Sequence, residues 1–223
     1  MKKKFALLLA ACLALAAVGC GSTAASGSAA TPAFSETADS QTQPTPTAEP
    51  EATPETTPEA EASSRILVAY FSCTGHTQAV AEQIAQQTGA DLYEITPADP
   101  YTAEDLNYND NNCRANQEMN DPAARPALGG DALELSDYDT ILLGYPIWWG
   151  TMPRILNTFL DTYDLSGKTV LPFCTSSSSG ISQSLAALKE VAPSADVRDG
   201  LRASGPEDSG IAAWLSQNGL TES

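Results

Sequence analysis

The stretch Ile66–Thr77, with the sequence ILVAYFSCTGHT, constrains the fold of this chain more than any other. It opens with an unbroken apolar run, Ile66–Phe71, which is typical of a central parallel strand covered on both faces. An amphipathic segment, Gln78–Gln87, follows, and Gly89 stands where a glycine commonly ends a helix. The stretch therefore predicts a buried strand, a tight turn and a helix whose N-terminus directs backbone N–H groups at one spot.

The turn within this unit predicts an anion site built from uncharged donors. It lacks the Gly-Lys-Ser/Thr of a nucleoside triphosphate loop, and a dinucleotide fingerprint needs two more glycines than Gly75. A cysteine phosphatase would need an arginine six positions after Cys73, where Ala79 stands. The alternative is an ordinary strand-to-helix turn rich in serine and threonine. We call this turn the cradle, and it consists of Ser72, Cys73, Thr74, Gly75, His76 and Thr77.

The first 19 residues predict a signal peptide. Three lysines precede the apolar stretch Phe5–Val18, which is too short for a typical membrane span. Cys20 follows Ala17-Val18-Gly19, and this pattern resembles a bacterial lipoprotein signal. The resemblance implies cleavage before Cys20 and lipidation of that cysteine, so that the exported protein would be held at the outer face of the cell membrane. The alternative is an ordinary secretory signal followed by a chance cysteine.

The charge of the chain limits its partners. It carries 28 acidic and 11 basic residues, for a net charge of −17, and loss of a leader with three lysines and no acid would make this −20. Such a charge argues against nucleic acid and against direct adhesion to an anionic membrane surface. It favours a basic protein partner, or simply solubility. The cysteines show neither C-x-x-C nor Cys/His ligand spacing, so we expect no metal site.

Residues 20–64 predict a disordered tether, because a segment of Ala, Ser, Thr, Pro and Glu buries too little apolar surface to offset its ordering entropy. Residues 65–223 alternate strand and helix patterns, which predicts an α/β domain with a doubly wound, five-stranded parallel sheet and helices on both faces. Its expected order, 2-1-3-4-5, places a ligand at the carboxyl ends of the first and third strands. The predicted strands are Ile66–Phe71, Asp91–Thr96, Thr140–Tyr145, Thr169–Cys174 and Val197–Ala203. The predicted helices are Gln78–Gln87, Pro153–Tyr163, Ile181–Val191 and Glu207–Asn218.

The segment Tyr101–Asp139 is long and polar for a connection within a compact domain. We expect a short helix near Asp110–Met119. Tyr101 and Tyr108 would then reach over the ligand as parts of a lid, or the whole segment is a solvated excursion.

Two further loops follow predicted strands at the same edge of the sheet. Adjacent tryptophans come after the third strand, where one indole would meet a flat aromatic ligand and the other would cover the core, or both would pack on a helix. A serine-rich turn follows the fourth strand and would bond the polar rim of that ligand, or serve only as a helix cap. The loops consist of Pro146, Ile147, Trp148, Trp149 and Gly150, and of Thr175, Ser176, Ser177, Ser178, Ser179 and Gly180.

These motifs together resemble the flavodoxin family over about residues 65–220. The motifs are Ser-x-Thr-Gly-x-Thr in the cradle, Tyr-Pro-x-Trp-Trp-Gly after the third strand, and Phe-Cys-Thr-x-x-x-Ser-Gly after the fourth. The resemblance implies an FMN cofactor and a role in electron transfer. Its phosphate would be held by Ser72, Thr74, Gly75, His76 and Thr77, with residues 146–150 lining the isoalloxazine ring and residues 175–180 flanking its other edge.

One departure from the family pattern bears on activity. Electron-carrier flavodoxins often place a tyrosine after the fourth strand, and no aromatic residue stands there in this chain. One flavin face would then be open, or covered by Tyr101 or Tyr108, and an open face suits a small acceptor such as a quinone. The function is therefore electron transfer with a redox partner protein, or NAD(P)H:quinone reduction, or non-catalytic binding of flavin or another phosphate ligand.

Overall fold

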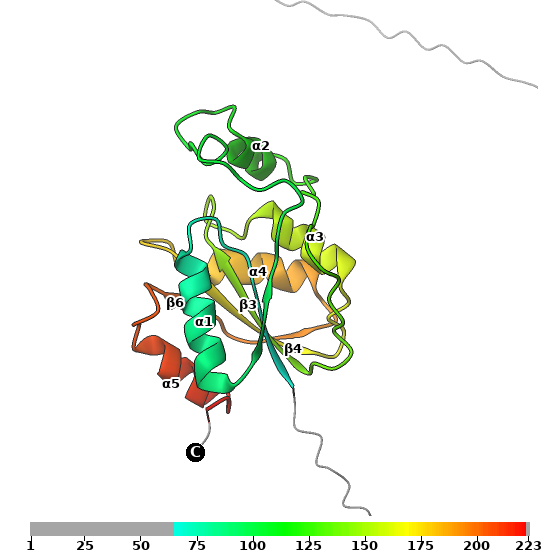
Figure 1. The fold of residues 1–223 in the computed structure, drawn as a ribbon, viewed down its shortest axis with the longest axis vertical. Coiled ribbons are helices and arrows are strands. Elements are labelled where there is room, and N and C mark those ends of the chain that lie inside the picture. The colour runs from blue at the N-terminus through cyan, green and yellow to red at the C-terminus, as the bar shows by residue number, and fades with distance from the viewer. Residues whose placement is uncertain (1–64, 222–223) are drawn as a thin grey trace, which may run out of the picture. The chain divides into compact units, whose positions relative to one another are not determined.

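A twisted parallel sheet forms the centre of the structure, a computed structural model that describes residues 65–221 (Figure 1). Its strand order is β2-β1-β3-β4-β5, and every strand pair is parallel. This order confirms the predicted fold class. The strands are β1 (Ile66–Tyr70), β2 (Asp91–Glu94), β3 (Thr140–Pro146), β4 (Thr169–Thr175), β5 (Asp196–Val197) and β6 (Leu201–Ala203).

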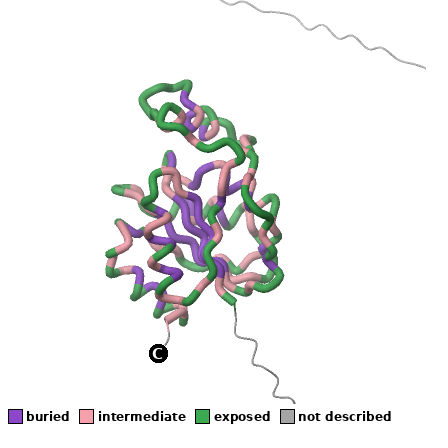
Figure 2. Tube along the Cα trace, in the orientation of Figure 1, coloured by how far each residue is buried: buried purple, intermediate pink, exposed green. Residues whose placement is uncertain are grey.

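Helices cover both faces of the sheet, as the alternating pattern predicts. Buried residues run along the central strands (Figure 2). Leu67 and Ala69 of β1 belong to one buried cluster, whereas Val68 and Tyr70 belong to another on the opposite face. The first cluster includes side chains of α3 (Arg154–Thr162) and α4 (Ser182–Val191), and the second includes side chains of α1 (His76–Thr88) and α5 (Gly210–Gln217). Burial on both faces explains why the central strands are apolar at successive positions.

The predicted fifth strand, Val197–Ala203, is wrong as a continuous element. Val197 of β5 pairs with Val170, but Leu201 of β6 pairs with Phe173, so one extra residue lies between the two short strands. The cause lies in β4, where Pro172 has no backbone N–H.

The missing donor faces the interruption. The N–H of Arg198 donates to the carbonyl of Val170 at 2.9 Å. Backbone groups two residues apart point the same way along a strand, so the nitrogen of Pro172 also faces the fifth strand. Gly200 fills the gap because a Cβ there would lie 2.8 Å from the carbonyl oxygen of Pro172.

The long polar segment packs against the carboxyl edge of the sheet (Figure 1). It contains the expected short helix, α2 (Arg114–Asn120). The ring of Tyr101 contacts that of Phe71 with centroids 5.8 Å apart. Arg154 of α3 donates to the carbonyl oxygens of residues 118 and 119 at 3.3 and 3.2 Å. These contacts hold the segment on the domain instead of leaving it as a solvated excursion.

Three predictions concern residues that the structure does not describe. The predicted signal peptide (1–19), the predicted lipidation of Cys20 and the predicted tether (20–64) lie outside the described residues. Within residues 65–221, none of the helices has both the length and the apolar character needed to cross a bilayer.

Candidate functional site

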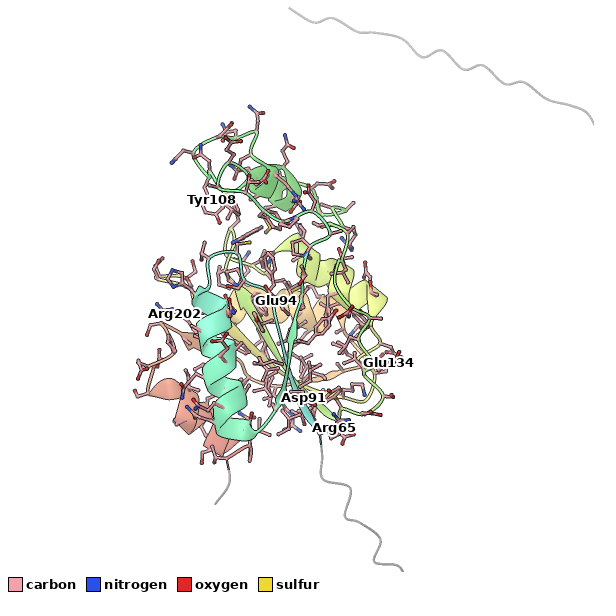
Figure 3. All side chains as sticks on the ribbon, in the orientation of Figure 1. Arg65, Asp91, Glu94, Tyr108, Glu134 and Arg202 are labelled. Carbon is pink, nitrogen blue, oxygen red and sulfur yellow. The ribbon has the colours of Figure 1, made fainter. Side chains whose placement is uncertain are left out.

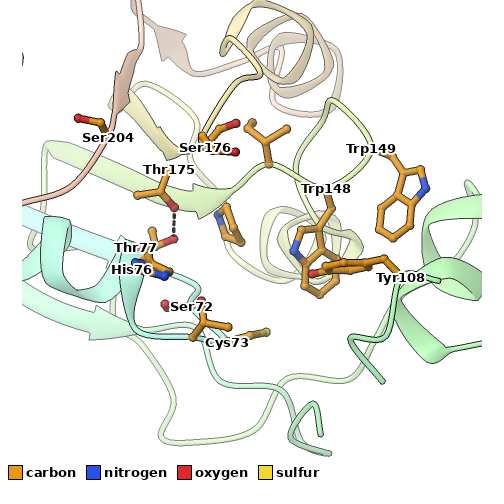
Figure 4. A pocket seen from close by; sticks show the side chains of 14 residues that line it. Ser72, Cys73, His76, Thr77, Tyr108, Trp148, Trp149, Thr175, Ser176 and Ser204 are labelled. Carbon is orange, nitrogen blue, oxygen red and sulfur yellow. Dashed lines mark hydrogen bonds between the residues drawn. The ribbon is translucent and has the colours of Figure 1, made fainter. Parts of the chain in front are cut away.

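A cavity of about 710 Å³ opens where β1, β3 and β4 end (Figure 4). Its size lies in the range of about 300–1,000 Å³ that is common for small-molecule sites. The three predicted loops meet there because carboxyl ends of parallel strands share one edge of the sheet. The lining residues are Ser72, Cys73, Thr74, His76 and Thr77, then Pro146, Ile147, Trp148 and Trp149, then Thr175, Ser176 and Ser177, with Tyr108 and Ser204 in addition.

Five predicted site residues lie in these loops without lining the cavity, and they are Gly75, Gly150, Ser178, Ser179 and Gly180. Gly75 precedes α1 in the left-handed region, with φ of 82°, and its N–H donates to the hydroxyl of Ser72 at 3.1 Å. A side chain at that position would be strained, because this backbone conformation suits glycine.

The cradle presents uncharged donors to the cavity. Within the described residues, the backbone N–H groups of His76, Thr77 and Gln78 find no acceptor, as expected for the first turn of a helix. Thr77 is 1% exposed, and its hydroxyl oxygen lies 2.7 Å from that of Thr175 at the end of β4. The cradle can therefore bind an anion through backbone dipoles and hydroxyl groups.

Cys73 is not a nucleophile in this setting. Burial raises the pKa of its thiol to about 12, and the nearby Arg114 opposes that rise only partly. The thiol therefore stays protonated at neutral pH, whereas nucleophilic cysteines react as thiolates. Cys73 acts as a small apolar part of the cavity wall.

The two tryptophans occupy different environments. Trp148 is 5% exposed and belongs to the core, while Trp149 is 47% exposed. Residues 148 and 151 exchange two backbone hydrogen bonds of 2.9 Å, with positive φ at Trp149 (48°) and Gly150 (80°) between them. This is a type I′ turn. Extended backbone would place the two indoles on opposite sides, as the predicted division between ligand and core requires, but the backbone here turns. Both indoles therefore border the cavity.

Tyr108 covers the tryptophans from the long polar segment (Figures 3 and 4). The centroid of its ring lies 5.2 Å from that of Trp149 and 6.4 Å from that of Trp148, and the rings meet edge to face in both cases. The buried side-chain amide of Asn116 holds this position by donating to the carbonyls of Tyr108 (3.2 Å) and Asp110 (2.7 Å). Of the two candidate lid residues, Tyr108 therefore lines the cavity, and Tyr101 packs behind Trp148.

Ser204 is the lining residue that sequence reasoning missed. It follows β6, whose carboxyl end lies at the same edge of the sheet. Its place directly after the predicted fifth strand is the feature of the sequence that could have identified it. Its N–H and hydroxyl donate to one carboxylate oxygen of Asp208 at 2.9 and 2.8 Å. These two bonds fix Ser204 at the rim of the cavity.

The fold and the site define a doubly wound α/β protein with a hydroxyl-rich, aromatic-walled cavity at the carboxyl edge of its sheet. The model of the flavodoxin family matches residues 65–218, so the chain belongs to that family.

Solved structures share this architecture. A candidate flavoprotein from Bacteroides eggerthii is 43% identical, with a TM-score of 0.66 and coverage of 71% of this chain and 100% of that one. A flavoprotein from Lactobacillus acidophilus, solved in complex with FMN, is 23% identical, with a TM-score of 0.57 and coverage of 69% and 99%. The second likeness supports the fold alone.

A curated relative adds an activity for comparison. An NAD(P)H dehydrogenase (quinone) from Archaeoglobus fulgidus is 31% identical over 102 residues, which make up 44% of this chain. The match spans half of the length of that relative.

Proposed function

We propose that this protein is an FMN-binding flavoprotein that takes part in electron transfer. The observation that carries the proposal is one cavity that joins a neutral anion cradle to an aromatic wall. A ligand with a phosphate at one end and a flat aromatic ring at the other matches both parts. Membership of the flavodoxin family supports FMN as that ligand.

The residues present fit FMN. The α1 N-terminus offers free N–H groups, and Ser72, Thr74 and Thr77 add hydroxyls beside them, so a phosphate would be solvated without a cation. Trp149 offers an exposed aromatic surface, and the serine-rich loop after β4 lies across the cavity from it (Figure 4). When bound, FMN supplies one- and two-electron redox chemistry, while the protein orients it and sets its electrostatics.

The charge of the protein bears on the reduction potential. The chain is strongly acidic, and among residues 65–221 no lysine or arginine lines the cavity. Added negative charge on the cofactor would meet hydroxyl and amide donors in the cavity wall and an acidic protein around it. We therefore expect a reduction potential below that of free FMN, which redox titration of the loaded protein would measure.

The second candidate function is NAD(P)H:quinone reduction. It is supported by the Archaeoglobus relative and by the loop after β4, which carries no aromatic side chain over the cavity. The open side suits a flat acceptor such as a quinone. A third candidate, of a different class, is non-catalytic binding of flavin or another phosphate ligand.

We propose that the protein is exported and anchored through a lipid on Cys20. The support is the sequence pattern of the leader. The domain is compatible with such an anchor, because Arg65 at its entry and Tyr108 at the cavity lie at opposite ends in Figure 3. A lipid at the N-terminal side would leave the cavity accessible to partners. Metabolic labelling with a palmitate analogue, compared with Cys20→Ala, would test the anchor.

The visible spectrum of the purified protein tests the main proposal. We expect a yellow protein with flavin absorption, or a colourless protein that becomes yellow with added FMN. A protein that takes up no FMN would end the proposal. Rapid bleaching by NADPH in stopped-flow mixing would favour the reductase, inertness would favour the carrier, and loss of flavin on reduction would favour simple capture.

A further inference from the structure

The side chain of Arg202, on β6, binds the backbone of the loop that follows β4. Its Nε and Nη2 donate to the carbonyl oxygen of Ser176 at 3.1 and 2.8 Å, and its Nη2 also donates to that of Ser177 at 2.9 Å. Both serines line the cavity, whereas Arg202 does not. The guanidinium thus acts on the cavity through the loop.

These bonds set the direction of one peptide group. In a planar trans peptide the C=O and N–H point in opposite directions. Because the carbonyl of Ser176 points to the guanidinium, the N–H of Ser177 points away from it. The hydroxyl of Ser176 accepts the next two N–H groups, from Ser178 (3.3 Å) and Ser179 (2.9 Å). The N–H of Ser177 has no acceptor among residues 65–221.

We infer that Arg202 is a positioning residue, whose two-carbonyl clamp directs the Ser177 N–H into the cavity as a donor to the polar rim of the flavin ring. This inference rests on the proposed FMN binding. The pyrimidine edge of a flavin carries carbonyl oxygens, which accept such a bond. Arginine suits the role because its planar fork binds two acceptors at once, which the ammonium of lysine does not reproduce.

The competing explanation is that Arg202 acts through its charge, by attracting the FMN phosphate. Three variants and two ligands separate the two explanations. Arg202→Met removes both fork and charge, and Arg202→Lys keeps the charge without the fork. Arg198→Met is the matched control, because Arg198 pairs with Asp196 at 2.7 Å and does not line the cavity. Riboflavin has the ring of FMN without its phosphate.

Flavin affinities would be measured by fluorescence titration of the full chain after removal of bound flavin. We expect both Arg202 variants to weaken FMN and riboflavin binding by the same factor, about three- to tenfold, the range for loss of one hydrogen bond. Arg198→Met should change neither affinity by more than about twofold. Wild-type affinity in Arg202→Lys, or loss of FMN but not riboflavin affinity in Arg202→Met, would overturn the clamp.

An NMR measurement gives a readout that does not depend on affinity. In the wild-type protein, FMN should move the Ser177 amide proton downfield and slow its exchange with solvent. In Arg202→Lys saturated with FMN, both effects should shrink. If FMN changes neither the chemical shift nor the solvent exchange of the wild-type Ser177 amide, the inference is refuted even if every variant folds poorly. A wild-type protein that binds no flavin at all would instead remove the proposed function.

Discussion

The hydroxyl groups of Thr77 and Thr175 lie 2.7 Å apart, although 98 residues separate them in the chain. Thr77 is the last residue of the cradle and lies in the first turn of α1, and Thr175 ends β4 and begins the serine-rich loop. This hydrogen bond ties together the two hydroxyl-rich loops on which the cavity is built. It links part of the stability of the fold to the geometry of the site.

Replacement of either threonine by valine should therefore destabilise the protein. Valine keeps the shape but leaves the other hydroxyl without this partner, at a cost of about 1 kcal/mol. Thr77→Val and Thr175→Val together should cost less than the sum of the single changes, because both remove the same bond. Urea unfolding of the flavin-free protein measures all three. Strictly additive losses would show that the bond contributes nothing.

Trp149→Asn should change stability and flavin binding in opposite directions. Trp149 holds φ of 48° in its type I′ turn, where a bulky residue costs on the order of 1–2 kcal/mol, and Asn-Gly is the preferred pair for such a turn. The flavin-free variant should unfold about 1 kcal/mol less readily, while FMN binding should weaken. Trp149→Phe, which keeps both the ring and the strain, is the control. If Trp149→Asn binds FMN normally, the indole has no part in the site.

Gly144→Ala should be strongly destabilising. A Cβ on this β3 residue would lie 2.2 Å from Cζ of Phe173. Phe173 lies on the neighbouring strand β4, and its ring is fully buried. Overpacking of this severity costs about 3 kcal/mol. Gly144→Ala combined with Phe173→Leu should recover part of the loss in a urea titration. No recovery would place the strain in the backbone instead of the ring.

Asp208→Asn should destabilise the protein at neutral pH but not in acid. Backbone hydrogen bonds from Ser204 and Gly210, followed by the Ser204 hydroxyl, lower the pKa of the Asp208 carboxyl. A lowered folded-state pKa gives stability above the ordinary value of about 3.9, and that stability is lost as pH falls through the folded pKa. The gap in unfolding midpoint between wild type and variant should therefore close below about pH 4. A gap that does not vary with pH would contradict this origin.

Hydrophobic pattern was enough to predict most of the fold. The apolar run at Ile66–Phe71 and its equivalents in β3 and β4 require burial on both faces, and a parallel sheet covered by helices provides it. The interruption of the fifth strand was not foreseen, although Pro172 was visible in the sequence. The sequence alone does not show which neighbouring strand the nitrogen of Pro172 faces. That depends on strand register, and register is set by packing along the whole sheet.

The site was predictable as far as it depends on strand ends. Three loops after three strands converge because topology alone brings them to one edge. The turn at Trp149 and the place of Tyr108 depend on contacts between distant segments. The buried amide of Asn116, for example, fixes Tyr108 through backbone carbonyls, and no local pattern reveals such a bond.

Pro172 also has a consequence for the rim of the cavity. The extra residue opposite it advances β6 by one position, and this shift sets Arg202 beside Cys174, within reach of the serine loop. In a β4 with an ordinary amino acid at 172, the neighbouring strand could run without a break, and a different side chain would stand there. One imino acid in mid-strand thereby selects which residue of a distant segment governs the loop.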